Sequence, residues 1–147
     1  MHNKNLIKFL ASGFYSGLSP IAPGTAGTVV AAVLAGVWLQ KYTINLPLIL
    51  VLTLVGIVIS HWAEELYGEK DCQKIVIDEW AGYFVAMFGL GINMLIPAFI
   101  LFRIFDITKP SPIRNLQEFH GGIGIMLDDI LAGIMANLLI RLILAFV

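Results

Sequence analysis

"WAGYFVAMFGLGINMLIPAFILFRIF", residues 80–105, is the stretch that decides the fold, because it is long and apolar yet interrupted midway. A helix that spans a membrane needs about 20 mostly apolar residues, and this stretch is long enough to cross once. Gly89, Gly91, Asn93 and Pro97 lie near its middle, and glycine and proline weaken or end a helix. The stretch therefore forms either one crossing or a helical hairpin that returns to its starting side.

The composition of the whole chain is that of a membrane protein. Of the 147 residues, 59% are hydrophobic and only 13% are charged, about half the share usual in soluble domains. The mean hydropathy is +0.88. A net charge of −1 gives no basic field for nucleic acid, and the only cysteine, Cys72, excludes an internal disulfide and a cysteine-based zinc site. The length fits one domain, residues 1–147.

Three further apolar stretches flank residues 80–105 and complete a helical bundle. Residues 28–39 and 46–62 are separated by the short polar segment "QKYTIN" and are predicted to form an antiparallel helix pair. Both are short for a crossing and could tilt or sit in a thin region. Residues 124–147 could span from Asp129 onward, with Arg141 reaching toward the far surface. We predict an all-α integral membrane bundle with short or broken transmembrane helices.

The lysine and arginine distribution predicts the orientation. The polar segments that hold Lys4 and Lys8, Lys70 and Lys74, and Lys109 and Arg114 are richer in positive charge than the 40–45 loop, which holds only Lys41. Cytoplasmic loops carry the excess of such residues. A single crossing by residues 80–105 would carry Lys109 to the outside, so the charge pattern favours the hairpin or a broken helix.

Five carboxylates stand at the edges of apolar helices in this charge-poor chain. These residues are Asp78, Glu79, Asp106, Asp128 and Asp129. Carboxylates near a membrane are costly unless a partner neutralises them, and a divalent cation can do so through oxygen ligation. Mg²⁺ suits a few carboxylates with water and phosphate oxygens as further ligands, and no histidine or cysteine cluster competes. The pattern predicts a Mg²⁺ site at the cytoplasmic face.

Each of these acids also has a structural explanation. Asp78 could cap a helix with Glu79 in its first turn, where both would be favourable against the helix dipole. Asp106 could pair with Arg103 three residues earlier. The adjacent Asp128 and Asp129 are harder to explain in this way, because the sequence places no cation within one helical turn of them.

A candidate phosphate-binding segment precedes the first apolar helix. In "SPIAPGTAGT", residues 19–28, the run from Thr25 through Gly27 to Thr28 resembles a helix N-terminus with free N–H groups, which can bind anions. No lysine follows the glycines, so this is no nucleotide-binding Walker loop. Lys109 lies in a loop stiffened by prolines and could compensate phosphate charge. Together with the acids, these features indicate hydrolysis or transfer of a phosphate group on a membrane-embedded substrate.

Four segments in this order closely resemble the phosphatidylglycerophosphatase A family. The resemblance covers about residues 13–136, and the segments are "LSPIAPGTAGT", "IVIDEWAG", "FRIFDITKPSPI" and "HGGIGIMLDDILAG". It implies an all-helical, Mg²⁺-dependent lipid phosphatase that converts phosphatidylglycerophosphate to phosphatidylglycerol. It further implies a multi-pass protein of the bacterial inner membrane with its site facing the cytoplasm and the lipid bilayer as partner. The net charge and the absence of a Walker loop predict no nucleic acid and no nucleotide as partner.

The resemblance also assigns roles to matching positions. It implies metal ligation by the five acids, catalytic roles for Asp106, Asp128, Asp129 and Lys109, and substrate binding by Thr25, Gly27, Thr28 and Lys109, with Asp71 and His120 as secondary candidates. Asp106 could be a ligand, a general base or a nucleophile. The sequence leaves open whether one or two metals bind, and it does not indicate the oligomeric state.

Two other functions remain compatible with the sequence. One is a phosphatase of another lipid or small phosphomonoester, because related folds carry different substrates. The other is a small membrane transporter, since acids in membranes also serve proton relays. A transporter would place its acids at mid-membrane, whereas here they stand at helix ends beside polar loops, which favours surface chemistry.

Overall fold

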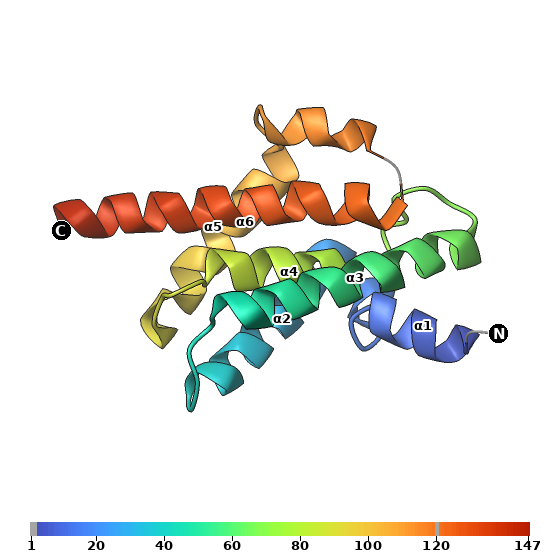
Figure 1. The fold of residues 1–147 in the computed structure, drawn as a ribbon, viewed down its shortest axis with the longest axis horizontal. Coiled ribbons are helices and arrows are strands. Elements are labelled where there is room, and N and C mark those ends of the chain that lie inside the picture. The colour runs from blue at the N-terminus through green and yellow to red at the C-terminus, as the bar shows by residue number, and fades with distance from the viewer. Residues whose placement is uncertain (1–2, 120) are drawn as a thin grey trace.

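The computed structural model describes residues 3–119 and 121–147, and within these ranges every regular element is helical (Figure 1). The all-α prediction is confirmed. His120, one of the secondary site candidates, lies outside the described residues. The elements are α1 (Lys4–Ala11), η1 (Ser16–Leu18), α2 (Pro23–Leu39), α3 (Leu46–Tyr67), α4 (Ile77–Ala86), η2 (Ile92–Met94), α5 (Leu95–Thr108), η3 (Ile113–Glu118) and α6 (Gly121–Phe146).

The apolar stretch at residues 80–105 is broken into a helical hairpin. α4 ends at Ala86 and α5 begins at Leu95, and the turn between them contains Gly89 at φ +65°, a backbone conformation that favours glycine. Asp78 at the start of α4 and Asp106 near the end of α5 line one cavity. The chain therefore returns to the end from which it started, as the charge pattern predicted.

α4 is the central helix of the bundle. All ten of its residues are buried, and it packs against α2, α3, α5 and α6. Apart from Asp78 and Glu79, its residues are apolar, aromatic or small, and such a helix is stable only when neighbours cover it. The fully buried Tyr83 lies edge-on to Phe102, and its hydroxyl donates to the Leu95 carbonyl at 2.7 Å, which ties α4 to α5.

Two glycines allow α4 and α6 to approach backbone to backbone. A Cβ atom added to Gly133 would lie 2.1 Å from the Gly82 carbonyl oxygen, and one added to Gly82 would lie 2.5 Å from the Asp129 carbonyl oxygen. Small residues are the usual means of bringing helices this close in membranes. Gly82 follows Asp78 by four residues and Gly133 follows Asp129 by four, so each glycine lies about one turn from an acid on the same helix face. The close approach therefore sets the distance between the acids.

The structure corrects the predicted helix bounds. α2 begins at Pro23, five residues before the predicted stretch 28–39, because proline suits the first helical position and Ala22 before it is left-handed. α3 continues past residue 62 to Tyr67 and ends at Gly68, again left-handed. Polar residues thus extend this helix beyond the apolar run that the hydropathy pattern detects.

The outer surfaces of the bundle are apolar. Val29, Val33 and Val37 on α2 recur at four-residue spacing and are all exposed, as are Ile96, Ile100 and Ile104 on α5. Soluble proteins place polar side chains on such faces. Leu46–Tyr67 and Gly121–Phe146 are long and apolar enough to cross a membrane, and most of each span is not buried within the protein. These surfaces indicate that the chain associates with a membrane.

Candidate active site

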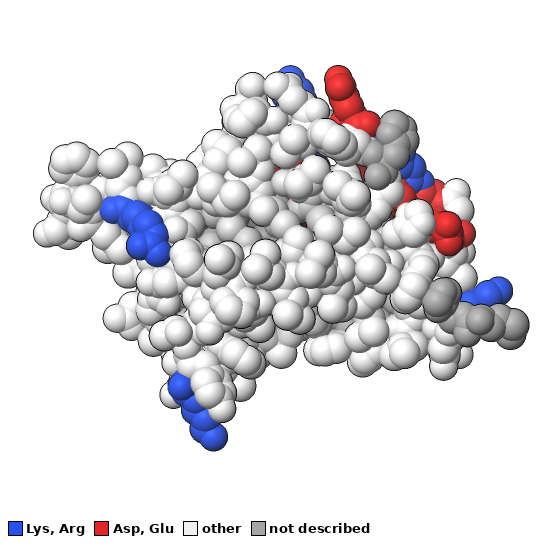
Figure 2. Space-filling view, viewed as in Figure 1, with Lys and Arg blue, Asp and Glu red and all other residues white. Residues whose placement is uncertain are grey.

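A polar cavity of about 520 Å³ opens where the hairpin of α4 and α5 meets α6 and the start of α2. It contains all five of the acids that the sequence singled out, together with Asp71 and Lys109. The acidic side chains visible in Figure 2 gather toward one edge of the molecule, while most of the surface in this view is uncharged. The predicted convergence of the acids is therefore observed, although the segments that carry them are up to 51 residues apart, from Asp78 to Asp129.

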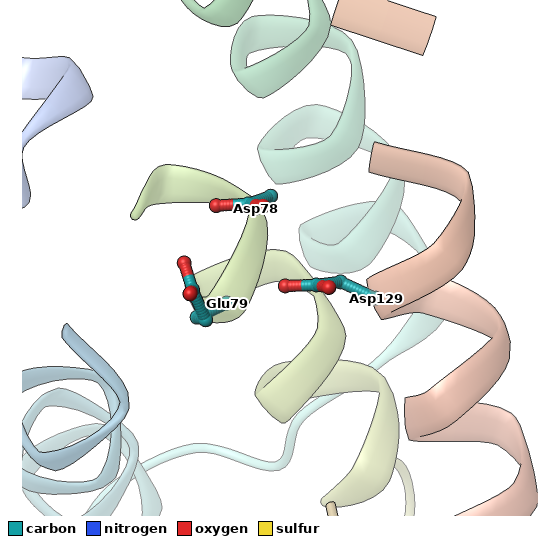
Figure 3. Close-up of side chains that lie close together, drawn as sticks. All are labelled: Asp78, Glu79 and Asp129. Carbon is teal, nitrogen blue, oxygen red and sulfur yellow. The ribbon is translucent and has the colours of Figure 1, made fainter. Parts of the chain in front are cut away.

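Three of these acids form a compact group. Asp78, Glu79 and Asp129 each offer a carboxylate oxygen, and these three oxygens lie within 4.8 Å of one another. Asp78 and Glu79 occupy the first turn of α4, and Asp129 projects toward them from α6 (Figure 3). Asp78 does not cap the helix, because the N-cap residue is Val76. This arrangement can hold one divalent cation.

The three carboxylates are buried and incompletely satisfied. Their exposed fractions are 7%, 8% and 2%, and the buried oxygens Asp78 Oδ1, Glu79 Oε2 and Asp129 Oδ2 have no hydrogen-bond partner among the described residues. At the start of α4, a helix too short to span a membrane, burial raises the pKa of the Asp78 and Glu79 carboxyl groups well above their usual values. A bound cation would remove this penalty, since its charge stabilises the ionised carboxylates.

The other two acids are already paired with cations. Lys109 Nζ donates to Asp128 Oδ2 at 2.6 Å, and Arg103 donates to Asp106 three residues along α5. Burial opposes the charge on Lys109, but its hydrogen bond to Asp128 and the neighbouring carboxylates outweigh that effect and raise the pKa of the ammonium group. The five predicted ligands thus divide into three acids that form no ion pair among the described residues and two that do.

The backbone at the start of α2 adds N–H donors to the edge of the cavity. Pro23 and Gly24 line it, and the first hydrogen bond at this helix end runs from the Ala26 N–H to the Ala22 carbonyl. The earlier N–H groups of the helix have no acceptor within it, so this edge can bind an anion. A Cβ atom on Gly24 would lie 2.6 Å from Glu79 Oε1 and 3.2 Å from Arg103 Nη2, so the missing side chain lets both residues lie against this helix end.

The structure places the predicted phosphate-side residues differently. Thr25, Gly27 and Thr28 do not appear among the residues that line the cavity. Thr28 is fully buried and its hydroxyl donates to the Gly24 carbonyl at 2.8 Å, while a Cβ atom on Gly27 would lie 2.6 Å from Val76. These two residues therefore support the packing of α2. Their role in substrate binding stays a prediction.

Sequence reasoning missed Arg103 and Gly24 as members of the site. The sequence indicates Arg103 only as a neutralising partner of Asp106, and that pairing is observed. Its side chain is 13% exposed and lines the cavity, and its Nε is buried without a hydrogen-bond partner among the described residues. A positive charge within an otherwise apolar helix was the available signal.

Comparison with known proteins agrees with this constellation. A family model described as Phosphatidylglycerophosphatase A matches residues 9–144. The chain belongs to this family. Membership of the phosphatidylglycerophosphatase A family makes the chain a phosphatase, in agreement with a cavity that combines carboxylates, two cations and a helix N-terminus. No solved structure matches the chain.

Relatives in three bacteria cover most of the chain. A phosphatidylglycerophosphatase A of Haemophilus influenzae is 38% identical over 142 residues, which span 92% of this chain and 87% of that protein. A phosphatidylglycerophosphatase A of Escherichia coli is 36% identical over 135 residues, spanning 86% and 77%. A protein of Bacteroides thetaiotaomicron, provisionally named a phosphatidylinositol-3-phosphatase, is 38% identical over 145 residues and 89% of each chain. All three relatives are named as phosphatases of a phosphorylated phospholipid.

Proposed function

We propose that the chain is a Mg²⁺-dependent phosphatase that hydrolyses phosphatidylglycerophosphate to phosphatidylglycerol and phosphate at the cytoplasmic face of a bacterial inner membrane. The names of two relatives support the substrate. The apolar outer surfaces support a lipid substrate over a soluble one. The excess of lysine in the segments around the cavity supports its orientation toward the cytoplasm.

One observation carries the proposal: three carboxylates, each with a buried oxygen that has no hydrogen-bond partner among the described residues, share a cavity with two cationic side chains and a helix N-terminus. The carboxylate oxygens of Asp78, Glu79 and Asp129 are hard ligands, and the soft thiol of Cys72, which also lines the cavity, is not part of the group whose ligand atoms lie within 4.8 Å of one another. This ligand set fits Mg²⁺. When bound there, the ion would supply charge neutralisation and polarise a phosphate oxygen.

The protein's own residues would bind and orient the phosphate. Lys109 and Arg103 offer N–H donors to its oxygens, and the N–H groups at the start of α2 add a partial positive charge. In the reaction a water oxygen bonds to phosphorus as the bond from phosphorus to the glycerol oxygen breaks, and that oxygen takes up a proton. Asp106 and Asp128 are the candidates to receive the proton from the attacking water, since both stand in the cavity with a cationic partner.

Exposed apolar residues flank the cavity and suit a substrate that stays in the bilayer. Ile107 lines the cavity and is 67% exposed, and Ile21, between two lining residues, is 81% exposed. Apolar side chains at the edge of a polar site can lie in the lipid while the headgroup enters the site. This arrangement supports binding of the phosphate headgroup in the cavity while the acyl chains stay in the membrane.

Phosphate release from phosphatidylglycerophosphate in detergent micelles tests the proposal. We expect release with Mg²⁺, none after EDTA, and recovery when Mg²⁺ is restored in excess. Asp129→Asn should lose most activity, whereas Glu118→Gln, which removes an exposed carboxylate outside the cavity, should match the wild type. Full activity in EDTA would refute the role of the metal.

A second candidate substrate is phosphatidylinositol 3-phosphate, because one relative carries that name. It presents the same phosphomonoester on a larger headgroup, and the same ligand set would serve its hydrolysis. Parallel assays of both lipids on the purified protein, compared by kcat/KM, decide between them. A higher kcat/KM for the inositol lipid would replace the proposed substrate and leave the assignment of a lipid phosphatase intact.

A further inference from the structure

An apolar groove of about 660 Å³ runs along the outside of the bundle between α3, α4 and α6, away from the acidic cavity. The two cavities share no lining residue. α3 and α6 run antiparallel here, so Thr53 and Ile130 mark one end of the groove and Leu46 and Arg141 the other. Its volume lies within the range of ligand sites, about 300–1,000 Å³.

Arg141 is held in a fixed position at its end of the groove. Its Nε donates to Asn137 Oδ1 at 2.8 Å and its Nη2 donates to the Phe88 carbonyl at 2.8 Å. Asn137 in turn donates to the carbonyls of Ala86 and Phe88 at the end of α4. These hydrogen bonds therefore anchor the side chain.

The charge of Arg141 is not neutralised by these contacts. Both acceptors are neutral, and none of the carboxylates in the described part of the chain forms an ion pair with it. A guanidinium group has five N–H donors and two are used, so the remaining donors, on an exposed residue, can reach a ligand. A positive charge beside an apolar groove favours a ligand that combines an anion with a hydrocarbon chain.

The groove is long enough to hold one acyl chain. From Ile130 to Arg141 the α6 axis advances about 16 Å, about half of the roughly 30 Å hydrocarbon thickness. Asp129 lies about 18 Å from Arg141 along the same axis, so with the acidic cavity at one membrane face, as proposed above, Arg141 lies past the middle of the hydrocarbon layer, in the opposite leaflet. A lipid chain that fills the groove would place its phosphate beside Arg141, at its outer end.

We infer that this groove binds one anionic glycerophospholipid of the opposite leaflet, with its phosphate on Arg141 and one acyl chain between α3 and α6. Arginine pairs with phosphate through two parallel hydrogen bonds, and the net negative charge of the lipid compensates the unpaired guanidinium. The inference rests on membrane placement and not on the phosphatase activity. It assigns the groove a lipid that is bound but not hydrolysed.

Native mass spectrometry of the purified full-length chain tests this site. The protein is incubated with dioleoylphosphatidylglycerol or with zwitterionic dioleoylphosphatidylethanolamine, and the bound fraction is measured against lipid concentration. We expect one phosphatidylglycerol per chain at low lipid concentration, held in preference to the zwitterionic lipid. Arg141→Gln should weaken retention about tenfold or more, since it removes a charge-assisted contact.

Matched variants distinguish lipid bound in the groove from lipid held by general charge attraction. Lys41→Gln removes an exposed positive charge in the connection that leads into α3 but outside the groove, and it should retain lipid as the wild type does. Ile134→Trp fills the groove without touching the Arg141 hydrogen bonds and should reduce retention. It also decides the outcome if Arg141→Gln does not fold, as judged by circular dichroism.

Three outcomes would overturn the inference. The first is equal retention by Ile134→Trp, or by folded Arg141→Gln, and the wild type. The second is an equal loss in Lys41→Gln, which would indicate general charge attraction. The third is a loss of the lipid in Asp129→Asn, which would place it in the acidic cavity. Phosphate release is measured separately, so failure here leaves the proposed phosphatase activity untouched.

Discussion

Gly133→Ala should disable the acidic cavity without changing any of its ionisable residues. The added Cβ atom would lie 2.1 Å from the Gly82 carbonyl oxygen and 3.0 Å from the carbonyl carbon. Both are backbone atoms of α4, so no side-chain rotation can relieve the clash. α4 and α6 must move apart at this point.

The required movement follows from the contact distance. A carbon and a carbonyl oxygen in contact lie about 3.3 Å apart, so the helices must separate locally by about 1.2 Å. The carboxylate oxygens of Asp78, Glu79 and Asp129 lie within 4.8 Å of one another, and a separation of this size would extend that span to about 6 Å. Two oxygens bound to the same Mg²⁺ ion lie at most about 4.2 Å apart, so side-chain rotation must close a gap of up to about 0.6 Å in the native protein but of about 1.8 Å in the variant. Asp129 would then no longer share an ion with the two acids of α4.

The expected loss of activity is about 100-fold, the usual effect of displacing a catalytic group by about 1 Å. Stability should fall by about 1–3 kcal/mol, as for other overpacked interfaces. The assay is phosphate release across a Mg²⁺ titration, with helix content followed by circular dichroism. Gly91→Ala is the matched control, because a Cβ atom there meets nothing within 4 Å and its φ of −84° suits alanine.

A folded Gly133→Ala protein with wild-type activity and an unchanged Mg²⁺ requirement would refute the reasoning. It would show that the spacing of α4 and α6 does not set the geometry of the acids. A loss of activity in Gly91→Ala of the same size would refute it in another way, since any added methyl group would then be harmful.

Three further predictions concern the ligands and the orientation. Asp129→Asn should raise the Mg²⁺ concentration for half-maximal phosphate release at least about tenfold, because a neutral amide lowers the charge of the site; an unchanged titration would exclude Asp129 as a ligand. Asp128→Asn should chiefly lower kcat/KM, by about 10- to 100-fold, because Lys109 loses its ionic anchor, and Lys109→Met should show a loss of similar size. If Asp128→Asn changed only the Mg²⁺ requirement, Asp128 would act as a metal ligand and not as the anchor of Lys109. Ser111→Cys in a Cys72→Ser background should resist a membrane-impermeant thiol reagent in intact cells and react in inverted vesicles; labelling from outside would reverse the proposed orientation.

The sequence predicted the helical class and the convergence of the acids because charge is scarce in this chain. With 13% charged residues, a carboxylate at the edge of an apolar helix stands out. The distribution of lysines predicted that both ends of residues 80–105 lie on the same side of the membrane. The glycines and Pro97 indicated the break between α4 and α5. These inferences need only local composition and the cost of placing charge in a membrane.

The pairing of the acids could not be predicted in the same way. Lys109 and Asp128 are 19 residues apart and meet only because α5 and α6 pack side by side. No Lys or Arg lies within one helical turn of Asp128, so the local sequence does not indicate that Lys109 is its partner. Likewise, the sequence does not distinguish Gly24 from Gly27. The structure shows that Gly24 lies against Glu79, whereas Gly27 packs against Val76.

The division into paired and unpaired acids explains how the fold tolerates five carboxylates and still leaves three of them available to a cation. Lys109 and Arg103 neutralise Asp128 and Asp106 within the fold, so these two pairs carry little net charge. Asp78, Glu79 and Asp129 have no such partner in the described residues, and three buried like charges oppose folding unless protons or a cation compensate them. The close approach of Gly82 and Gly133 holds these acids together against that repulsion. The packing of α4 on α6 thus maintains an arrangement of charge that a bound divalent cation would stabilise, which is the condition for a strong metal site in an otherwise apolar protein.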